Sequence, residues 1–179
     1  MKPNPGLENL LDQAVNKNIF GTKMRSVIKD DNEKGVALVV EQQFEIAKII
    51  IQKKLVPIIE PEVDIHCENK SEAEQMLFEN LKNHIEQLTS EQKILLKLTI
   101  PNEANLYAPF VNHPNVLRVF ALSGGYSRDD SNRLLSLNNG MLASFSRALT
   151  EGLSVQQSDD EFNSKLDVSI ESIYQASIS

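Results

Sequence analysis

Apolar positions along this chain repeat with two different periods, and the period changes from one segment to the next. Segments with an apolar residue every three or four positions are predicted to be helices, and short apolar runs rich in β-branched residues are predicted to be strands. The predicted helices cover residues 7–17, 37–54, 71–88, 104–112, 127–137 and 158–177. The predicted strands cover residues 19–28, 55–65, 94–100, 116–125 and 141–149.

The predicted strands and helices alternate along the chain. This alternation indicates βαβ units and a parallel sheet, because a crossover helix is the usual connection between adjacent parallel strands. Two helices also carry start signals: Ser71 stands three residues before Glu74, the spacing of a capping box, and Ser127 with Asp130 opens the next-to-last helix.

Each predicted strand has one apolar face and one face that becomes polar toward its C-terminal half. An open doubly wound sheet carries helices on both faces, so both faces should be apolar. In a (β/α) barrel one face looks into the lumen, and functional groups gather at its C-terminal end. We therefore predict an α/β fold of the (β/α)8 TIM barrel class. The lumen face is predicted to carry Lys23 and Arg25, then Val56, Ile58, Glu60 and Glu62, then Leu95 and Lys97, then Val119, Ala121 and Ser123.

Composition limits the kind of protein and its partners. The chain has 179 residues, enough for a single domain covering 1–179, and its net charge of −7 argues against nucleic acid or an anionic membrane as the main partner. Cys67 is the single cysteine, so no internal disulfide can form. No apolar run approaches ~20 residues, and the N-terminus lacks the apolar region of a signal peptide. We expect a cytoplasmic protein.

Lys97 is a charged residue in the middle of the apolar strand "ILLKLTIP" (94–101). In a lumen of low dielectric constant, with Lys23 and Arg25 nearby, its ammonium form is disfavoured. A neutral lysine amine attacks carbonyl carbons and forms Schiff bases. The alternative is a structural ion pair between Lys97 and Glu60 or Glu62.

Other polar residues of the same strands have two interpretations each. Glu60 and Glu62 could supply a general acid or base, or could be solvated carboxylates at a strand end. Lys23 and Arg25 could neutralise a phosphate group, or could form ion pairs with those glutamates.

The string "LSGGYS" ends the predicted fourth strand and leads into a helix. Its glycines allow main-chain N–H groups to approach an anion, and Arg147, near the end of the predicted last strand, could complete a phosphate site. Barrels often bind phosphate at the loops after their last two strands. His66 and Cys67 are adjacent but have no second ligand cluster, so we expect no metal and no cofactor.

Five strings of this sequence, in chain order, resemble the class I fructose-1,6-bisphosphate aldolases of the bacterial type: "GTKMRS", "VPIIEPEV", "LLKLTIP", "LSGGYSR" and "ASFSRAL". The resemblance covers essentially the whole chain, including "HPNVLRV" and "ESIYQAS". It implies a lyase that cleaves fructose 1,6-bisphosphate reversibly to dihydroxyacetone phosphate and glyceraldehyde 3-phosphate in glycolysis and gluconeogenesis, with a phosphosugar as its partner.

The resemblance also implies a role for each matching residue. Ser146 departs from the family pattern, because some relatives have glycine before the arginine. The implied roles are Schiff-base lysine for Lys97, proton acceptor for Glu60, partner carboxylate for Glu62, second active-site lysine for Lys23, and phosphate binding for Ser123, Gly124 and Arg147, with Arg25 as a further candidate phosphate ligand.

The family barrel has eight strands, and the five predicted here resemble strands four to eight. The family's aspartate from strand one and lysine from strand three would therefore lie upstream of Met1. On this interpretation the chain is the C-terminal part of an aldolase barrel, has at most trace activity alone, and self-associates or needs a missing N-terminal segment. The alternative is a non-catalytic remnant that acts as a phosphosugar-binding or interaction module.

Overall fold

The strands form one parallel sheet whose spatial order is their order along the chain, β1-β2-β3-β4-β5. The computed structural model describes residues 4–178. Sequential order is typical of barrel strands, whereas a doubly wound sheet reverses its order at a switch point. The predicted fold class is therefore confirmed, with five strands of barrel type. These are β1 (Gly21–Ile28), β2 (Val56–Val63), β3 (Ile94–Thr99), β4 (Val116–Leu122) and β5 (Leu142–Ala143).

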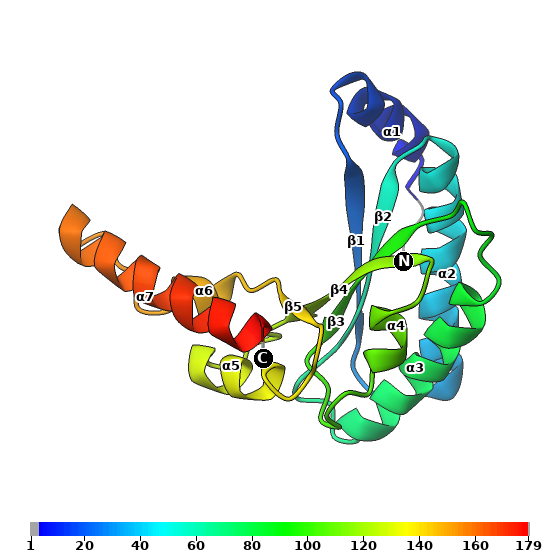
Figure 1. The fold of residues 1–179 in the computed structure, drawn as a ribbon. Coiled ribbons are helices and arrows are strands. Elements are labelled where there is room, and N and C mark those ends of the chain that lie inside the picture. The colour runs from blue at the N-terminus through cyan, green and yellow to red at the C-terminus, as the bar shows by residue number, and fades with distance from the viewer. Residues whose placement is uncertain (1–3, 179) are drawn as a thin grey trace.

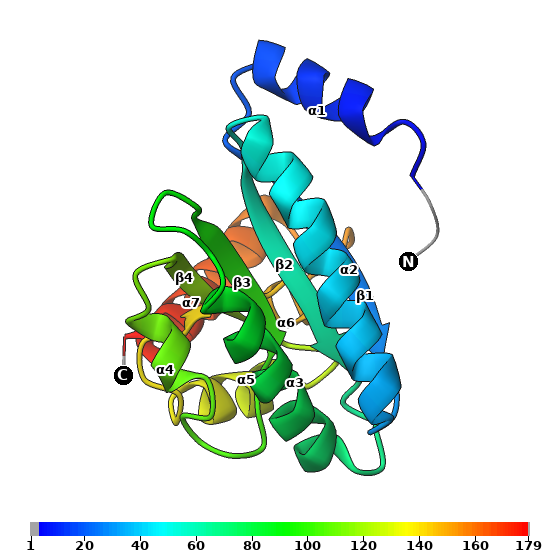
Figure 2. The ribbon, with the colours of Figure 1, turned by 90° about the vertical axis from the view of Figure 1, so that its right-hand side faces the viewer.

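The helices connect successive strands, and α2, α3 and α4 lie on one side of the sheet (Figure 1). Figure 2 shows α1 at the amino ends of the strands, where its Leu11 packs with Ile50 and Leu55. The last helix, α7, lies beyond β5 and contacts α5, α6 and β5. The helices are α1 (Leu7–Asn16), α2 (Glu33–Gln52), α3 (Lys70–Ile85), α4 (Ala108–Val111), α5 (Arg128–Leu135), α6 (Arg147–Thr150) and α7 (Asp159–Ser177).

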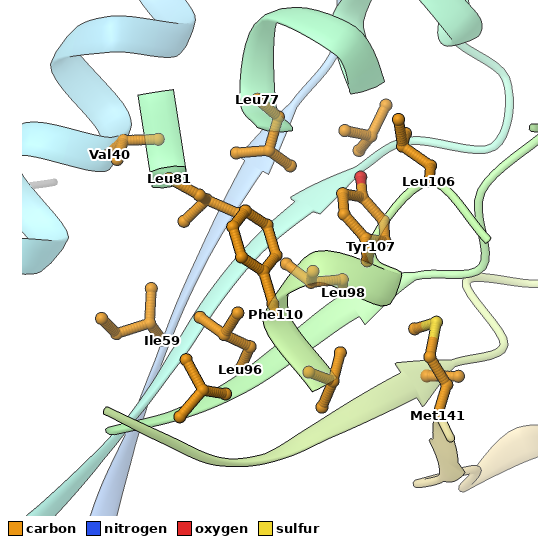
Figure 3. Packing of buried hydrophobic residues seen from close by; sticks show 14 of the residues in the cluster. Val40, Ile59, Leu77, Leu81, Leu96, Leu98, Leu106, Tyr107, Phe110 and Met141 are labelled. Carbon is orange, nitrogen blue, oxygen red and sulfur yellow. The ribbon is translucent and has the colours of Figure 1, made fainter. Parts of the chain in front are cut away.

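The main core lies between the sheet and the helices α2, α3 and α4. Figure 3 shows Leu81 of α3 and Phe110 of α4 close to Leu96 of β3. The predicted alternation in β2 and β3 is confirmed, because one face of each strand is fully buried under these helices: Ile59 and Val63 of β2, and Ile94, Leu96 and Leu98 of β3. Burying a side chain of this size stabilises the fold by about 1.5–3 kcal/mol. Among residues 4–178, no helix combines the length and the apolar character that a membrane crossing needs.

The prediction for the faces of β4 is wrong. Val119 and Ala121 are 1% and 0% exposed and belong to the core under the helices, not to the lumen face. The register between β3 and β4 shifts after Ile94, so that one extra residue of β4 is inserted before Val119. Such a bulge moves every later side chain to the other face. Phe120 therefore lies opposite Lys97, on the lumen face.

The prediction of a long last strand is also wrong. β5 has two residues, and Arg147 is the first residue of the short helix α6 instead of a strand residue. Phe145 and Leu149 line a groove together with residues of α7. These two apolar residues are four positions apart, which is the spacing of one face of a helix. Packing on α7 therefore overrides the strand-like pattern of residues 141–149.

The start of α3 differs from the predicted capping box. Asn69 precedes the helix, Ser71 lies inside it, and the Glu74 side chain turns inward to pair with Lys70. Glu74 Oε2 also accepts the Asn102 N–H at 3.0 Å. A capping box does occur at α7, between Ser158 and Glu161.

Lys70 and Glu74 form a buried ion pair, with side chains 5% and 1% exposed. The Lys70 ammonium also donates to the carbonyl of Ile100 and to Asn102 Oδ1, at 3.0 Å each. Burial raises the pKa of Glu74, and the charge of Lys70 opposes this rise. The pair joins α3 to the segment that follows β3.

Replacing Lys70 by methionine is expected to lower the free energy of unfolding by about 3–5 kcal/mol at pH 7, because it leaves a buried carboxylate without its partner. Because the pKa of the buried Glu74 is raised, its carboxylate can take up a proton as the pH falls toward 4.5, the ordinary pKa of a glutamate. The loss should therefore shrink at low pH. Urea unfolding of the variant and the unchanged protein, at pH 7 and pH 5, measures both effects.

The matched control is Lys53→Met, which removes the ion pair between Lys53 and Asp12 on the surface. Exposed ion pairs contribute little, so this variant should unfold almost as the unchanged protein does. Equal losses for the two variants would contradict the special role of the buried pair.

Candidate active site

A polar cleft of about 500 Å³ lies at the carboxyl ends of the strands. Every site residue predicted from the sequence lines it, although they come from three strands, the turn after β4 and the helix α6. The lining residues are Lys23 and Arg25, Glu60 and Glu62, Lys97, Ser123 and Gly124, and Arg147, together with Leu122, Ser144 and Ser146.

Glu60 lies between two lysines. Its carboxylate is 3% exposed; Oε2 accepts a hydrogen bond of 2.6 Å from Lys23 Nζ, and Oε1 lies 3.3 Å from Lys97 Nζ. The Lys97 side chain is 18% exposed. A carboxylate within reach of two amines can accept a proton from either of them. The predicted ion pair of Lys97 with Glu60 is therefore present, in a geometry that also allows proton transfer.

Arg25 is paired with Glu62. Its guanidinium donates to both oxygens of that carboxylate, at 2.8 and 3.0 Å. Hydrogen bonding to Glu62 raises the pKa of Arg25 further above its usual value. Of the two alternatives for Arg25, the ion pair is the one observed, and its guanidinium fork is already occupied.

The glycine turn after β4 requires glycine at residues 124 and 125. Their φ values are 64° and 127°, and a Cβ atom on Gly124 would lie 2.7 Å from a methyl group of Ile65. Ser123 is buried, and its carbonyl accepts the Tyr126 N–H at 2.9 Å. Glycine at these two residues therefore avoids both a strained main chain and a close approach to Ile65.

The Arg147 guanidinium lies beside this turn. A Cβ atom on Gly125 would be 3.7 Å from Arg147 Nη1. Arg147 is exposed and forms no ion pair with a carboxylate within residues 4–178. An unpaired guanidinium next to a glycine turn suits an anion that has several oxygens.

The sequence analysis missed Ser144 and the role of Arg128. Ser144 directly follows β5 and lines the cleft, and it belongs to the string "ASFSRAL" that the sequence analysis already singled out. Arg128 is the last residue of the string "LSGGYSR"; its Nε donates to Ala148 O at 2.9 Å, and its main-chain N–H donates to Glu151 Oε2 at 2.8 Å. Arg128 therefore links the start of α5 to the end of α6, whose first residue is Arg147.

His66 and Cys67 lie outside the cleft lining. Cys67 is buried, and burial raises the pKa of its thiol. Within residues 4–178, no three or more His, Cys, Asp or Glu side chains gather as metal ligands would.

A barrel-type sheet with a polar cleft at the carboxyl ends of its strands is the arrangement that defines the (β/α) barrel class of fold. The relatives of this chain specify the class further. The chain is 58% identical over 178 residues to the class 1 fructose-bisphosphate aldolase of Synechocystis, 56% to that of Porphyromonas gingivalis and 53% to that of Clostridium acetobutylicum. The resemblance to class I aldolases is therefore confirmed over 99% of this chain.

The chain spans about 60% of the length of these curated relatives. Among solved structures, the fructose-bisphosphate aldolase of Plasmodium falciparum, in complex with TRAP and a small-molecule inhibitor, superposes with a TM-score of 0.65 at 18% identity. This match covers 96% of the present chain and 59% of that protein, and it supports the fold. No family model matches the chain.

Proposed function

We propose that this chain carries the Schiff-base site of a class I fructose-bisphosphate aldolase. The observation that carries the proposal is the placement of Lys97 3.3 Å from the buried Glu60 carboxylate, within a cleft that also holds Arg147, an arginine with no carboxylate partner among the described residues. The identity of 53–58% with aldolases supports it independently. The substrate would be fructose 1,6-bisphosphate, and the products dihydroxyacetone phosphate and glyceraldehyde 3-phosphate.

In this proposal the neutral Lys97 amine attacks the ketone carbon of the open-chain substrate. Glu60 accepts a proton as the carbinolamine forms, and returns it to the hydroxyl group that leaves as water. The resulting iminium accepts the electron pair of the C3–C4 bond when that bond breaks, and the C4 hydroxyl loses its proton to become the aldehyde. Protonation of the enamine and hydrolysis release the ketone product and restore Lys97.

The remaining cleft residues have supporting roles. Lys23, 2.6 Å from Glu60, stabilises the charged carboxylate and contacts substrate near the reacting carbon. Glu62 holds Arg25 at the edge of the cleft. The glycine turn and Arg147 bind the phosphate of the ketone half, with Ser123 as a further hydrogen-bond donor.

Replacing Arg147 by alanine is expected to raise KM for fructose 1,6-bisphosphate by roughly tenfold or more. A charge-assisted fork on phosphate is typically worth about 1.5–3 kcal/mol, and the variant loses it. Steady-state cleavage assays with the bisphosphate and with an unphosphorylated ketose measure the effect. The unphosphorylated substrate should be affected little.

The matched control is Arg133→Ala, an exposed arginine of α5 with a weak 3.5 Å contact to Asp130. It should leave both substrates unaffected. If Arg147→Ala impaired the two substrates equally, the result would indicate misfolding, not loss of phosphate recognition.

A coupled assay for dihydroxyacetone phosphate tests the proposed function. With the remaining segment of a relative present, we expect cleavage of fructose 1,6-bisphosphate that Lys97→Met abolishes, and we expect at most trace cleavage by the chain alone. Because β1 and β5 each have one neighbour in the sheet, and because the relatives are longer, the assay includes the chain alone and the chain with the remaining segment of the Synechocystis relative. Phosphosugar binding in both samples with no cleavage in either would favour the non-catalytic binding module.

A further inference from the structure

Gln43 is a buried amide in the middle of α2, on the face that packs against the sheet. It is 0% exposed, and the other residues of this face, Val40, Phe44 and Ala47, are apolar core residues. Gln43 Oε1 accepts a hydrogen bond of 2.9 Å from the main-chain N–H of Glu60. Gln43 thus connects α2 to the residue whose carboxylate lies between the two active-site lysines.

The side-chain amide of Gln43 lowers the stability of the fold. Its Nε2 is buried and has no hydrogen-bond partner within residues 4–178. A buried donor without a partner costs free energy, and an apolar side chain of the same size would avoid that cost. A polar side chain retained at such a position indicates a role other than packing.

The sheet itself leaves Glu60 weakly held on the side of β3. The pairing of β2 with β3 ends at Ile59 and Leu96, one residue before Glu60. Pro61 has no N–H to donate to a neighbouring strand. Farther along β3, a side-chain hydrogen bond takes the place of one between main chains: the Thr99 hydroxyl donates to the carbonyl of Val63 in β2 at 2.7 Å. On this side of β2, the hydrogen bond that the Glu60 N–H donates to Gln43 Oε1 supplies a constraint that pairing with β3 does not. On the other side, β1 pairs with β2 through Arg25 and Glu60.

We propose that Gln43 is a positioning residue for Glu60. By accepting the Glu60 N–H, it holds that carboxylate within 2.6 Å of Lys23 and 3.3 Å of Lys97. Imine formation at Lys97 needs a proton acceptor at this place, so displacement of Glu60 slows the reaction more than it weakens substrate binding. The catalytic part of this inference rests on the proposed function, and the positioning part does not.

The test compares Gln43→Met with Ile50→Met in the full chain. Methionine matches glutamine in size, but its thioether is a weak acceptor. Ile50 is also a buried residue of α2, 2% exposed, and packs in the cluster around Leu11. Deuterium exchange of the Glu60 amide should become about tenfold faster or more in Gln43→Met and stay unchanged in Ile50→Met.

Urea unfolding distinguishes positioning from a structural role. Gln43→Met removes one unpaired buried donor, Nε2, but leaves the Glu60 N–H without its acceptor. These two effects oppose each other, so the free energy of unfolding should change little. A loss of stability as large as that of Lys70→Met would mean that Gln43 is a structural residue and would overturn the inference.

Two further measurements test the position of the Glu60 carboxylate and its effect on the reaction. Lys97→Met should move the ¹³C resonance of this carboxyl group, and in the Gln43→Met background that movement should fall to about half or less. The rate at which borohydride traps an imine with saturating dihydroxyacetone phosphate should fall about tenfold or more in Gln43→Met. The ligand concentration that gives half the maximal rate should change little.

Each outcome decides the inference. An unchanged Glu60 amide, or an unchanged response of its carboxyl resonance, would show that Gln43 does not position Glu60. Altered resonances with an unaltered trapping rate would show that the position has no catalytic consequence. If the unchanged protein forms no adduct even when supplemented with the remaining segment of the Synechocystis relative, the proposed function fails. The exchange and resonance measurements still decide whether Gln43 positions Glu60.

Discussion

Incubation of the chain, supplemented with the remaining segment of the Synechocystis relative, with dihydroxyacetone phosphate and sodium borohydride is expected to attach a reduced adduct to Lys97. The imine forms between the ketone carbon and a neutral amine, and Lys97 is the cleft lysine beside the buried Glu60 at 3.3 Å. Borohydride converts the imine to a stable secondary amine. Digestion and mass spectrometry locate the added mass on the peptide that contains residues 94–100.

Variants of the two cleft lysines provide the controls. Lys97→Met should form no adduct and should cleave no substrate. Lys23→Met should still form an adduct at Lys97, more slowly, because Lys23 contacts Glu60 and not the ketone carbon in this proposal. An adduct on Lys23 of the unchanged protein would contradict the assignment of Lys97.

Replacing Glu60 by glutamine should slow turnover and imine trapping by roughly 10²–10⁴. Glutamine keeps the size of the side chain but cannot accept the proton that carbinolamine formation releases. It also removes the negative charge between Lys23 and Lys97. Binding of dihydroxyacetone phosphate should change much less, because Arg147 and the glycine turn, and not Glu60, bind the phosphate in this proposal.

Glu62→Gln is the matched control, since it removes the neighbouring carboxylate that pairs with Arg25. It should reduce turnover far less than Glu60→Gln does. Thermal unfolding of both variants separates chemistry from folding. A Glu60→Gln variant with near-normal turnover would mean that Glu60 serves only as a counter-ion.

The sequence predicted those parts of the fold that depend on regular local patterns. The faces of β2 and β3 follow from simple alternation, so Glu60 and Lys97 were assigned correctly to one side of the sheet. The ion pair of Arg25 with Glu62 was one of two open alternatives. The sequence could not decide between them, because the choice depends on the register of β1 and β2.

The wrong predictions have a common physical origin in tertiary contacts. Glu74 has the spacing of a capping residue, but a buried lysine one turn earlier attracts it more strongly. Residues 141–149 alternate like a strand, but packing of Phe145 and Leu149 beside α7 bends the chain into α6. In the sequence, Gln43 is one polar residue among several in a predicted helix. Its role depends on the hydrogen bond that it accepts from the Glu60 N–H of β2, which the sequence pattern does not reveal.

The bulge in β4 makes one residue of this strand dispensable for the placement of its side chains. Leu117 and Arg118 lie between the residues where the register shifts, and Arg118 is exposed. A substitution of Arg118 should be tolerated. Deletion of this one residue would remove the bulge and leave Val119 opposite Leu96 and Phe120 opposite Lys97, so the later side chains would keep their faces. Among natural variants of this strand, we therefore expect both changes of residue identity and a single-residue deletion at Arg118.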